Sequence, residues 1–297
     1  MVKKWLGLFL CAASIAGAET LSIATYNVEN YGPADRITEA GYRTDYPKPE
    51  AEKRALRSVI RALDADLLVL QEMGDAAHLE ELRRDLQSDG LTYAYAALLV
   101  GKDADRHVAL LSKRPLKRVT QHTDLSFAYM GSRETVKRGL LEVVVATEGG
   151  DLTLFAVHLK SRFTDRPDDP LSATRRAGEA TAVRDRVLQR FPAPATERFV
   201  ILGDCNDDKT SKALAHLQER GKTTVAELLP ATDSRGETWT HYYAKIESYS
   251  RVDHLLVSPL LRLAVKGGAA RIYDGPGVKE ASDHRPVIVT LALNAPK

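Results

Sequence analysis

Runs of hydrophobic residues along the chain predict both strands and helices. Glu50–Ala65 spaces its apolar side chains three and four positions apart, which is the pattern of one helix face. Leu140–Thr147 and Leu152–Val157 are apolar runs on either side of a Glu-Gly-Gly-Asp turn, which predicts a hairpin. Further helices are expected at Ala77–Gln87, Ser172–Arg190 and Thr210–Arg220. Further strands are expected at Leu21–Tyr26, Asp66–Leu70, Tyr93–Val100, His107–Ser112, Phe199–Leu202, Val252–Val257 and Val287–Leu293.

Helices separate some of these strands and hairpins join others, which favours an α/β layered fold with mixed sheets over an all-parallel sheet. About ten strands are more than one compact twisted sheet holds comfortably, so we expect two packed sheets flanked by helices. No repeat or Gly/Ser linker divides residues 19–297, which we expect to form one domain. Tyr31–Pro49 and Phe163–Asp169 are expected to be long surface loops.

The first 18 residues have the pattern of a cleaved export signal. Lys3 and Lys4 precede a 14-residue, mostly apolar run that closes on the small residues of Ala16–Ala18. A membrane anchor or a buried helix is the alternative, but this run is too short to cross a bilayer. We expect cleavage near Ala18 and a periplasmic or secreted protein with no stable membrane anchor. Leu10 before Cys11 disfavours lipidation, because a lipoprotein signal requires a small residue there.

The overall charge argues against a broad basic surface. The chain has 42 Lys and Arg against 40 Asp and Glu, and removal of residues 1–18 leaves 40 of each. A protein that holds nucleic acid over a wide basic face carries a larger positive excess. A local site must therefore supply the attraction for any anionic substrate. The composition is that of an ordinary soluble globular protein, with 28% charged and 44% hydrophobic residues.

Polar side chains occur where the predicted strands begin and end. These positions are Asn27, Glu72, His158, Asp204 with Asn206, Asp253, and Asp283 with His284. In a mixed sheet the end of one strand lies beside the start of an antiparallel neighbour, so all of them can gather along one edge. Carboxylate and amide oxygens suit Mg²⁺, Mn²⁺ or Ca²⁺ better than a softer metal. The two histidines offer proton transfer or donors to a phosphate oxyanion.

These positions lie in six short blocks that together resemble the endonuclease/exonuclease/phosphatase (DNase I-like) superfamily. The blocks are Thr25–Asn30, Leu70–Glu72, Val157–Ser161, Gly203–Asp207, Arg251–His254 and Ser282–Val287, and they run in order over nearly the whole chain after residue 18. Each block alone is a weak signal, whereas six in order are specific. The resemblance implies a four-layer α/β/β/α sandwich of two mixed β-sheets. It also implies metal-dependent phosphoester hydrolysis by an activated water.

The resemblance also assigns a role to each position. Glu72 matches the principal metal ligand, with Asn27 beside it and Asp283 contributing. Glu29 is an open candidate for an outer ligand, because only some relatives carry an acid there. The catalytic candidates are Asp204 and Asn206 on the attacking water, His158 on the phosphate, and His284 oriented by Asp253. Lys160, Arg106 and Arg138 are candidates for contacts with the substrate phosphates, although a solvated lysine is an equal reading of Lys160.

The expected function is that of an exported phosphodiesterase that uses Mg²⁺ or a similar cation, with nucleic acid as the leading substrate. The alternative is a phosphoesterase for phospholipid or inositol-phosphate substrates, which the lack of an exposed aromatic hairpin typical of membrane insertion disfavours. A binding module without catalysis is disfavoured because the polar set is complete. His254, His241, Trp239 and Tyr243 are ambiguous, and packing is the favoured reading for the aromatic group. Cys205 is expected to be a buried hydrophobe. No protein partner is indicated.

Overall fold

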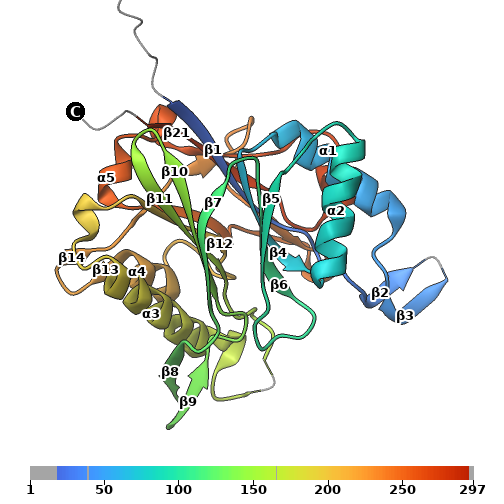
Figure 1. The fold of residues 1–297 in the computed structure, drawn as a ribbon. Helices are drawn as coiled ribbons and strands as arrows, with labels where there is room; N and C mark the ends of the chain where they lie inside the picture. Colours follow the sequence, from blue (N-terminus) through green and yellow to red (C-terminus); the bar gives the residue numbers. More distant parts are fainter. Residues whose placement is uncertain (1–18, 39, 165, 294–297) are drawn as a thin grey trace, which may run out of the picture.

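The fold comes from a computed structural model that describes residues 19–38, 40–164 and 166–293. The predicted export signal lies outside the described residues. Two mixed β-sheets pack face to face, and helices cover their outer faces (Figure 1). The four-layer α/β/β/α arrangement expected from the sequence is therefore confirmed.

Each sheet combines parallel and antiparallel pairs. The seven-stranded sheet has the order β16 (Ala231–Thr232), β20 (Ala270–Ile272), β21 (Val287–Leu293), β1 (Glu19–Asn27), β4 (Leu67–Met73), β6 (His107–Ser112) and β5 (Tyr95–Leu99). The six-stranded sheet has the order β15 (Glu227–Leu228), β19 (Asp253–Val257), β12 (Phe199–Asp204), β11 (Gly150–His158), β10 (Leu140–Thr147) and β7 (Leu116–His122). β1 is parallel to β4 and β11 is parallel to β12, whereas β1 with β21 and β12 with β19 are antiparallel.

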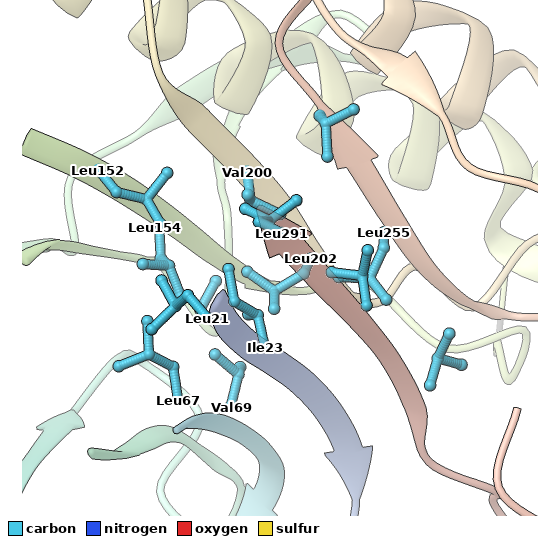
Figure 2. Close-up of a cluster of buried hydrophobic side chains, with 14 of the residues drawn as sticks. Leu21, Ile23, Leu67, Val69, Leu152, Leu154, Val200, Leu202, Leu255 and Leu291 are labelled. Carbon is cyan, nitrogen blue, oxygen red and sulfur yellow. The ribbon is translucent and has the colours of Figure 1, made fainter. Parts of the chain in front are cut away.

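The central strands are buried on both faces, which explains their continuous apolar runs. Alternate residues of one strand enter different cores, because successive side chains point to opposite faces of a sheet. Val200 and Leu202 of β12 lie between the sheets, while Phe199 and Ile201 face the helices. Figure 2 shows the inter-sheet core, which includes Leu21, Ile23, Val69, Leu154, Leu255 and Leu291.

Three helices cover the seven-stranded sheet, and two cover the other. The first group is α1 (Glu50–Leu63), α2 (Ala76–Ser88) and α6 (Val278–Ala281), and the second is α3 (Ala173–Arg190) and α4 (Lys212–Gln218). Asp75 caps α2 by accepting a hydrogen bond from the His78 amide at 3.1 Å, and Ser211 caps α4 in the same way. A short helix, α5 (Pro259–Arg262), follows β19. No helix in the described part of the chain is long and apolar enough to cross a membrane.

The structure corrects one sequence-based expectation about loops. The predicted loop at Tyr31–Pro49 contains a hairpin of β2 (Ala34–Thr38) and β3 (Gly41–Tyr46), which projects from the body of the molecule (Figure 1). Other hairpins that the pattern did not reveal are β8 (Ser126–Tyr129) with β9 (Ser132–Thr135), β13 (Glu219–Arg220) with β14 (Thr223–Thr224), and β17 (His241–Tyr243) with β18 (Ser248–Ser250).

Candidate active site

Three neighbouring strands bring the first catalytic candidates into one row. His158 at the end of β11 pairs in register with Asp204 at the end of β12, and Asp204 pairs with Asp253 at the start of β19. All three side chains are buried. From the other sheet, the Asn27 amide at the end of β1 donates a hydrogen bond to Asp204 Oδ2 at 3.0 Å. The two sheets therefore meet at Asp204, as the strand-end pattern predicted.

Several residues of the site have a strained backbone. Glu29, Asn30, Glu72 and Asn206 have φ values between 49° and 60°, in the left-handed region that side chains other than glycine rarely adopt. At Glu72 the pairing of β4 with β6 shifts register, which is the signature of a β-bulge. Such conformations cost about 1–3 kcal/mol each and concentrate at functional sites. The folded protein holds these side chains in place at the expense of stability.

Gly203 permits the close approach of β11 and β12 directly before this row. Its φ is +144°, and a Cβ atom built there would lie 1.9 Å from the Val157 carbonyl oxygen. Any side chain would separate the two strands. The glycine of the Gly203–Asp207 block is therefore needed to bring His158 beside Asp204.

Asn206 is positioned by Asp204 itself. Its backbone amide donates to Asp204 Oδ1 at 2.8 Å, and its side-chain amide donates to Asp204 Oδ2 at 3.1 Å and to the Leu159 carbonyl at 3.0 Å. Burial and the nearby Asp253 raise the pKa of Asp204 to about 6. Asp204 is thus a carboxylate whose pKa lies close to neutral pH, which suits a group that accepts a proton from water.

His284 is a buried cation. Its Nδ1 atom lies 2.8 Å from Asp253 Oδ2. Burial alone lowers the pKa of His284, but the carboxylates of Asp253, Asp283 and Asp204 outweigh it and raise the pKa well above its ordinary value. Nδ1 is taken by Asp253, so Nε2 is the nitrogen that can face a substrate.

His158 is a buried neutral imidazole. Burial, together with the positive charges of Arg138, His284, Arg106 and Lys160, lowers its pKa well below the ordinary value. Its Nε2 atom lies 3.5 Å from Asp204 Oδ2 and 3.9 Å from Glu72 Oε1. Neither ring nitrogen has a hydrogen-bond partner among the described residues. A buried polar group without a partner is costly, which is a reason to expect a ligand there.

The candidate metal ligands form two groups around these histidines. Glu72 lies next to His158, while Asp283 lies 3.9 Å from His284 Nε2. Glu29 accepts a hydrogen bond from the Asp283 amide at 3.1 Å, and burial and the charge of Asp283 raise the pKa of Glu29 to about 7. Carboxylates that lie this close together are stabilised by a divalent cation, so the oxygen atoms of Glu29 and Asp283 fit one.

The three basic candidates lie near the site, but other groups hold their side chains. Arg138 is buried and donates to Asp103 at 3.1 Å and to the Leu159 carbonyl at 3.1 Å. Arg106 lies 4.0 Å from Asp103. Lys160 Nζ donates to Ser161 and to the Phe163 carbonyl, and burial together with the charge of Arg138 lowers its pKa to about 8. Their charges influence His158, while direct phosphate contact stays a prediction.

His241 belongs to the site, whereas the sequence favoured a packing role for the aromatic group around it. His241 of β17 forms an antiparallel bridge with His284, and the centroids of their rings are 4.5 Å apart. Its Nε2 atom lies 3.4 Å from Asp283 Oδ2. Burial raises the pKa of Asp283, but His241 and His284 lower it below its ordinary value. No spacing in the sequence links His241 to the six blocks, so pattern alone could not place it there.

His254 and Cys205 lie outside the site. His254 follows Asp253 and therefore points to the opposite face of β19, where its Nε2 atom lies 2.9 Å from the Asp207 carbonyl. Cys205 is fully buried and free, as expected, in the core beneath α3 and α4.

The β17–β18 hairpin contradicts the expectation that no exposed aromatic hairpin is present. Tyr243 is 42% exposed, Ile246 is 71% exposed and Tyr249 is 59% exposed. The hairpin was not predicted, because polar residues interrupt the apolar ones between positions 241 and 250. A lipid substrate is therefore not disfavoured on this ground.

Comparison with known proteins gives a consistent family match. The model of the endonuclease/exonuclease/phosphatase family matches residues 24–284. Sphingomyelinase C from Streptomyces griseocarneus is similar in structure, with a TM-score of 0.61 and 20% identity over 92% of this chain and 99% of that chain. Beta toxin from Staphylococcus aureus has a TM-score of 0.63 and 17% identity over 91% of this chain and 99% of that chain. The human Nocturnin catalytic domain has a TM-score of 0.62 and 15% identity over 91% of this chain and 93% of that chain. At these identities the likeness shows the fold. No curated protein sequence matches this chain.

Proposed function

Because this chain belongs to the endonuclease/exonuclease/phosphatase family, whose members hydrolyse phosphoesters, we propose that it is an exported, divalent-metal-dependent phosphodiesterase that acts on nucleic acid. One observation carries this proposal: two buried histidines, one among positive charges and one among carboxylates, lie beside one buried carboxylate. His158 and His284 supply the two imidazoles, and Asp204 supplies the carboxylate.

Each group has a chemical task in the proposed hydrolysis. Asp204 orients the attacking water and accepts its proton, and Asn27 and Asn206 hold the Asp204 carboxylate in place. His284 presents a positive Nε2–H to the phosphate, where negative charge develops in the transition state. Asp253 keeps that imidazole charged and correctly oriented. His158, as a neutral imidazole, donates a hydrogen bond to a second phosphate oxygen from its single N–H group.

The metal ligands in this proposal are Glu72, Asn27 and Asp283, with Glu29 behind Asp283. Their oxygen donors fit Mg²⁺, and also Mn²⁺ or Ca²⁺. When bound, such an ion neutralises charge on the phosphoryl oxygens. It also favours the ionised form of Glu29, because a nearby positive charge lowers the pKa of a carboxyl group.

A diester fits the charges of the site better than a monoester. A terminal phosphate monoester carries nearly two negative charges, and sites that prefer it usually surround it with several free cations. Here the side chains of Lys160 and Arg138 are already engaged, which leaves His284 as the cation closest to Asp204. The formally neutral surface predicts weak nucleic-acid binding with a shallow salt dependence.

A phospholipid headgroup diester is the second candidate substrate. The exposed Tyr243 and Ile246 of the β17–β18 hairpin support it, because apolar side chains beside an active site suit a lipid surface. An inositol-phosphate monoester is less well supported, for the charge reason given above.

A substrate panel tests the proposal. Plasmid DNA, linear DNA, RNA, bis-p-nitrophenyl phosphate, p-nitrophenyl phosphate and phospholipid vesicles are incubated with the protein and Mg²⁺. We expect the diester to be cleaved faster than the monoester and plasmid DNA to be nicked without sequence preference. EDTA should abolish the activity, and Mg²⁺ or Mn²⁺ should restore it. A chelated enzyme that stays fully active, or a preference for the monoester with intact DNA, contradicts the proposal.

A further inference from the structure

A cavity of about 1000 Å³ opens beside Asp283, and neither His158 nor Glu72 is among the residues that line it. Glu29 and Asp283 line its catalytic end, and Trp239, Tyr242 and Tyr249 line its wall together with Arg235 and Lys279. The cavity is far larger than a phosphate group. It therefore has room for a substituent of the phosphodiester and not only for its phosphate.

The aromatic side chains of this cavity contact one another and form a continuous wall. Tyr242 and Tyr249 are cross-strand partners in the β17–β18 hairpin, and their ring centroids are 4.7 Å apart with a tilt of 30°. Trp239 continues the row, with its centroid 4.7 Å from that of Tyr249. Cross-strand pairing thus fixes the wall without any ligand.

Arg285 packs against one face of the Trp239 ring and also contacts its backbone. Its guanidinium carbon lies 3.4 Å from the Trp239 ring centroid, and its side chain donates to the Trp239 carbonyl at 3.1 Å and to Asp233 at 2.9 Å. Arg285 is buried, so this arrangement is part of the protein interior. Arg285 also directly follows His284, which ties the position of the wall to that of the catalytic imidazole.

We propose that this wall is a stacking subsite for a nucleobase next to the scissile phosphate; this inference rests on the proposed function and deepens it. Flat heterocycles stack on aromatic side chains without regard to sequence. A quaternary ammonium headgroup would need rings that converge around a point. Here the rings lean on each other in a row, and Arg285 already covers one face of Trp239. Lys279 lies along the same cavity, where flanking phosphates of a nucleic acid would pass, whereas Arg235 is paired with Asp233 and Glu237.

Tryptophan fluorescence can measure this binding directly. The chain has two tryptophans, Trp5 and Trp239, so the full-length chain with Trp5→Phe reports on Trp239 alone. The ligands are a short oligothymidylate and an oligonucleotide of equal length and charge in which abasic sugars replace the bases, both titrated in EDTA. We expect the oligothymidylate to quench Trp239 and to bind about tenfold more tightly than the abasic strand.

Two tyrosine substitutions in this background separate stacking from general effects of the hairpin. Tyr249→Ala should remove the difference in affinity between the two strands, and Tyr249→Phe should retain it. Tyr243→Ala is the matched control, because Tyr243 is exposed on the same hairpin and does not line the cavity. It should leave both affinities unchanged.

Equal affinity for the two strands in the Trp5→Phe protein would overturn the inference, and so would quenching by phosphocholine but not by the oligothymidylate. Failure of the proposed function gives a different result, since Mg²⁺ would then support no cleavage of bis-p-nitrophenyl phosphate. If the protein cleaves DNA but binds both strands equally well, the proposed nuclease function would stand and the proposed nucleobase subsite would be contradicted.

Discussion

The β11–β12 end around His158 and the β19–β21 end around His284 contain the same buried residue type in opposite states of charge. His284 has a carboxylate at 2.8 Å, whereas the ring nitrogens of His158 have no hydrogen-bond partner and its charged neighbours include arginines and a lysine. Burial disfavours the imidazolium at both positions, so the neighbouring charges decide the outcome. The surroundings thus lower the pKa of His158 and raise that of His284 within one site. The two histidines cannot exchange tasks.

Removal of either imidazole should have the largest effect on catalysis. His284→Ala loses a cation that faces the developing charge, and His158→Ala loses a neutral donor, so each should lower kcat by roughly 10²- to 10⁴-fold. The double variant should lose less than the product of the two effects, because both groups act on one phosphate. Steady-state kinetics on bis-p-nitrophenyl phosphate measures this, and a single variant with wild-type kcat would identify a structural histidine.

Asp253→Asn should reduce the difference between the two ends while leaving both imidazoles in place. Without the Asp253 carboxylate, only Asp283 and Asp204 still oppose the effect of burial, so the pKa of His284 falls. We expect kcat to fall by about 10²-fold. Asp208→Asn is the control, because Asp208 is an exposed carboxylate that pairs with Arg162. Equal kcat values for the two variants would show that the charge of His284 is not needed.

His254 is another buried histidine, and the effect of its surroundings on its pKa can be measured through the free energy of unfolding. Burial and the charge of Arg251 lower its pKa to about 4, whereas an unfolded chain titrates near 6.5. Between these values the unfolded state binds more protons, so the contribution of His254 is present above pH 6.5 and is lost as the pH falls toward 4. In urea unfolding, the free energy of unfolding of the wild-type protein should fall by about 2 kcal/mol more than that of His254→Gln between pH 7 and pH 4.5. Parallel pH curves for the two proteins would contradict this.

Lys160→Met should have the smallest effect. The ammonium of Lys160 donates to loop oxygens of Ser161 and Phe163, and its influence on His158 is through charge. Loss of that charge should change kcat by about threefold, which is within the range of a partly screened interaction. A loss of 10²-fold would instead indicate that Lys160 contacts the phosphate during the reaction.

Buried elements could be predicted from the sequence, and exposed ones could not. β21 and β10 were predicted with their observed bounds, because strands covered on both faces read as apolar runs. All six residues of β3 are exposed, and β7 is an edge strand with mostly exposed side chains, so neither shows a hydrophobic period. Tertiary pairing determines such strands more than local sequence does.

Some residues of the candidate site could likewise be predicted from the sequence, and others could not. Asp204 and Asn206 lie together and Cys205 points away from them, as alternation along the strand predicted, although Asn206 lies beyond the end of β12 with φ 53°. His254, which the sequence left ambiguous, lies outside the site. His241 could not be predicted, because an isolated bridge between β17 and the segment before β21 brings it to His284. The backbone strain at Glu72 depends on a register shift between two strands, and a shift of that kind leaves no trace in residue composition.

β21 pairs with β1, although almost the whole chain lies between them, and Ser282 donates to the Asn27 carbonyl at 2.8 Å. Folding must therefore bring together residues that lie 255 positions apart in the sequence, which slows it compared with folding through local contacts. Asp283 and His284 directly precede β21, so a partly folded chain in which β21 has not yet paired with β1 lacks a complete candidate site. The pairing of these two distant strands is thus the step of folding that completes the site.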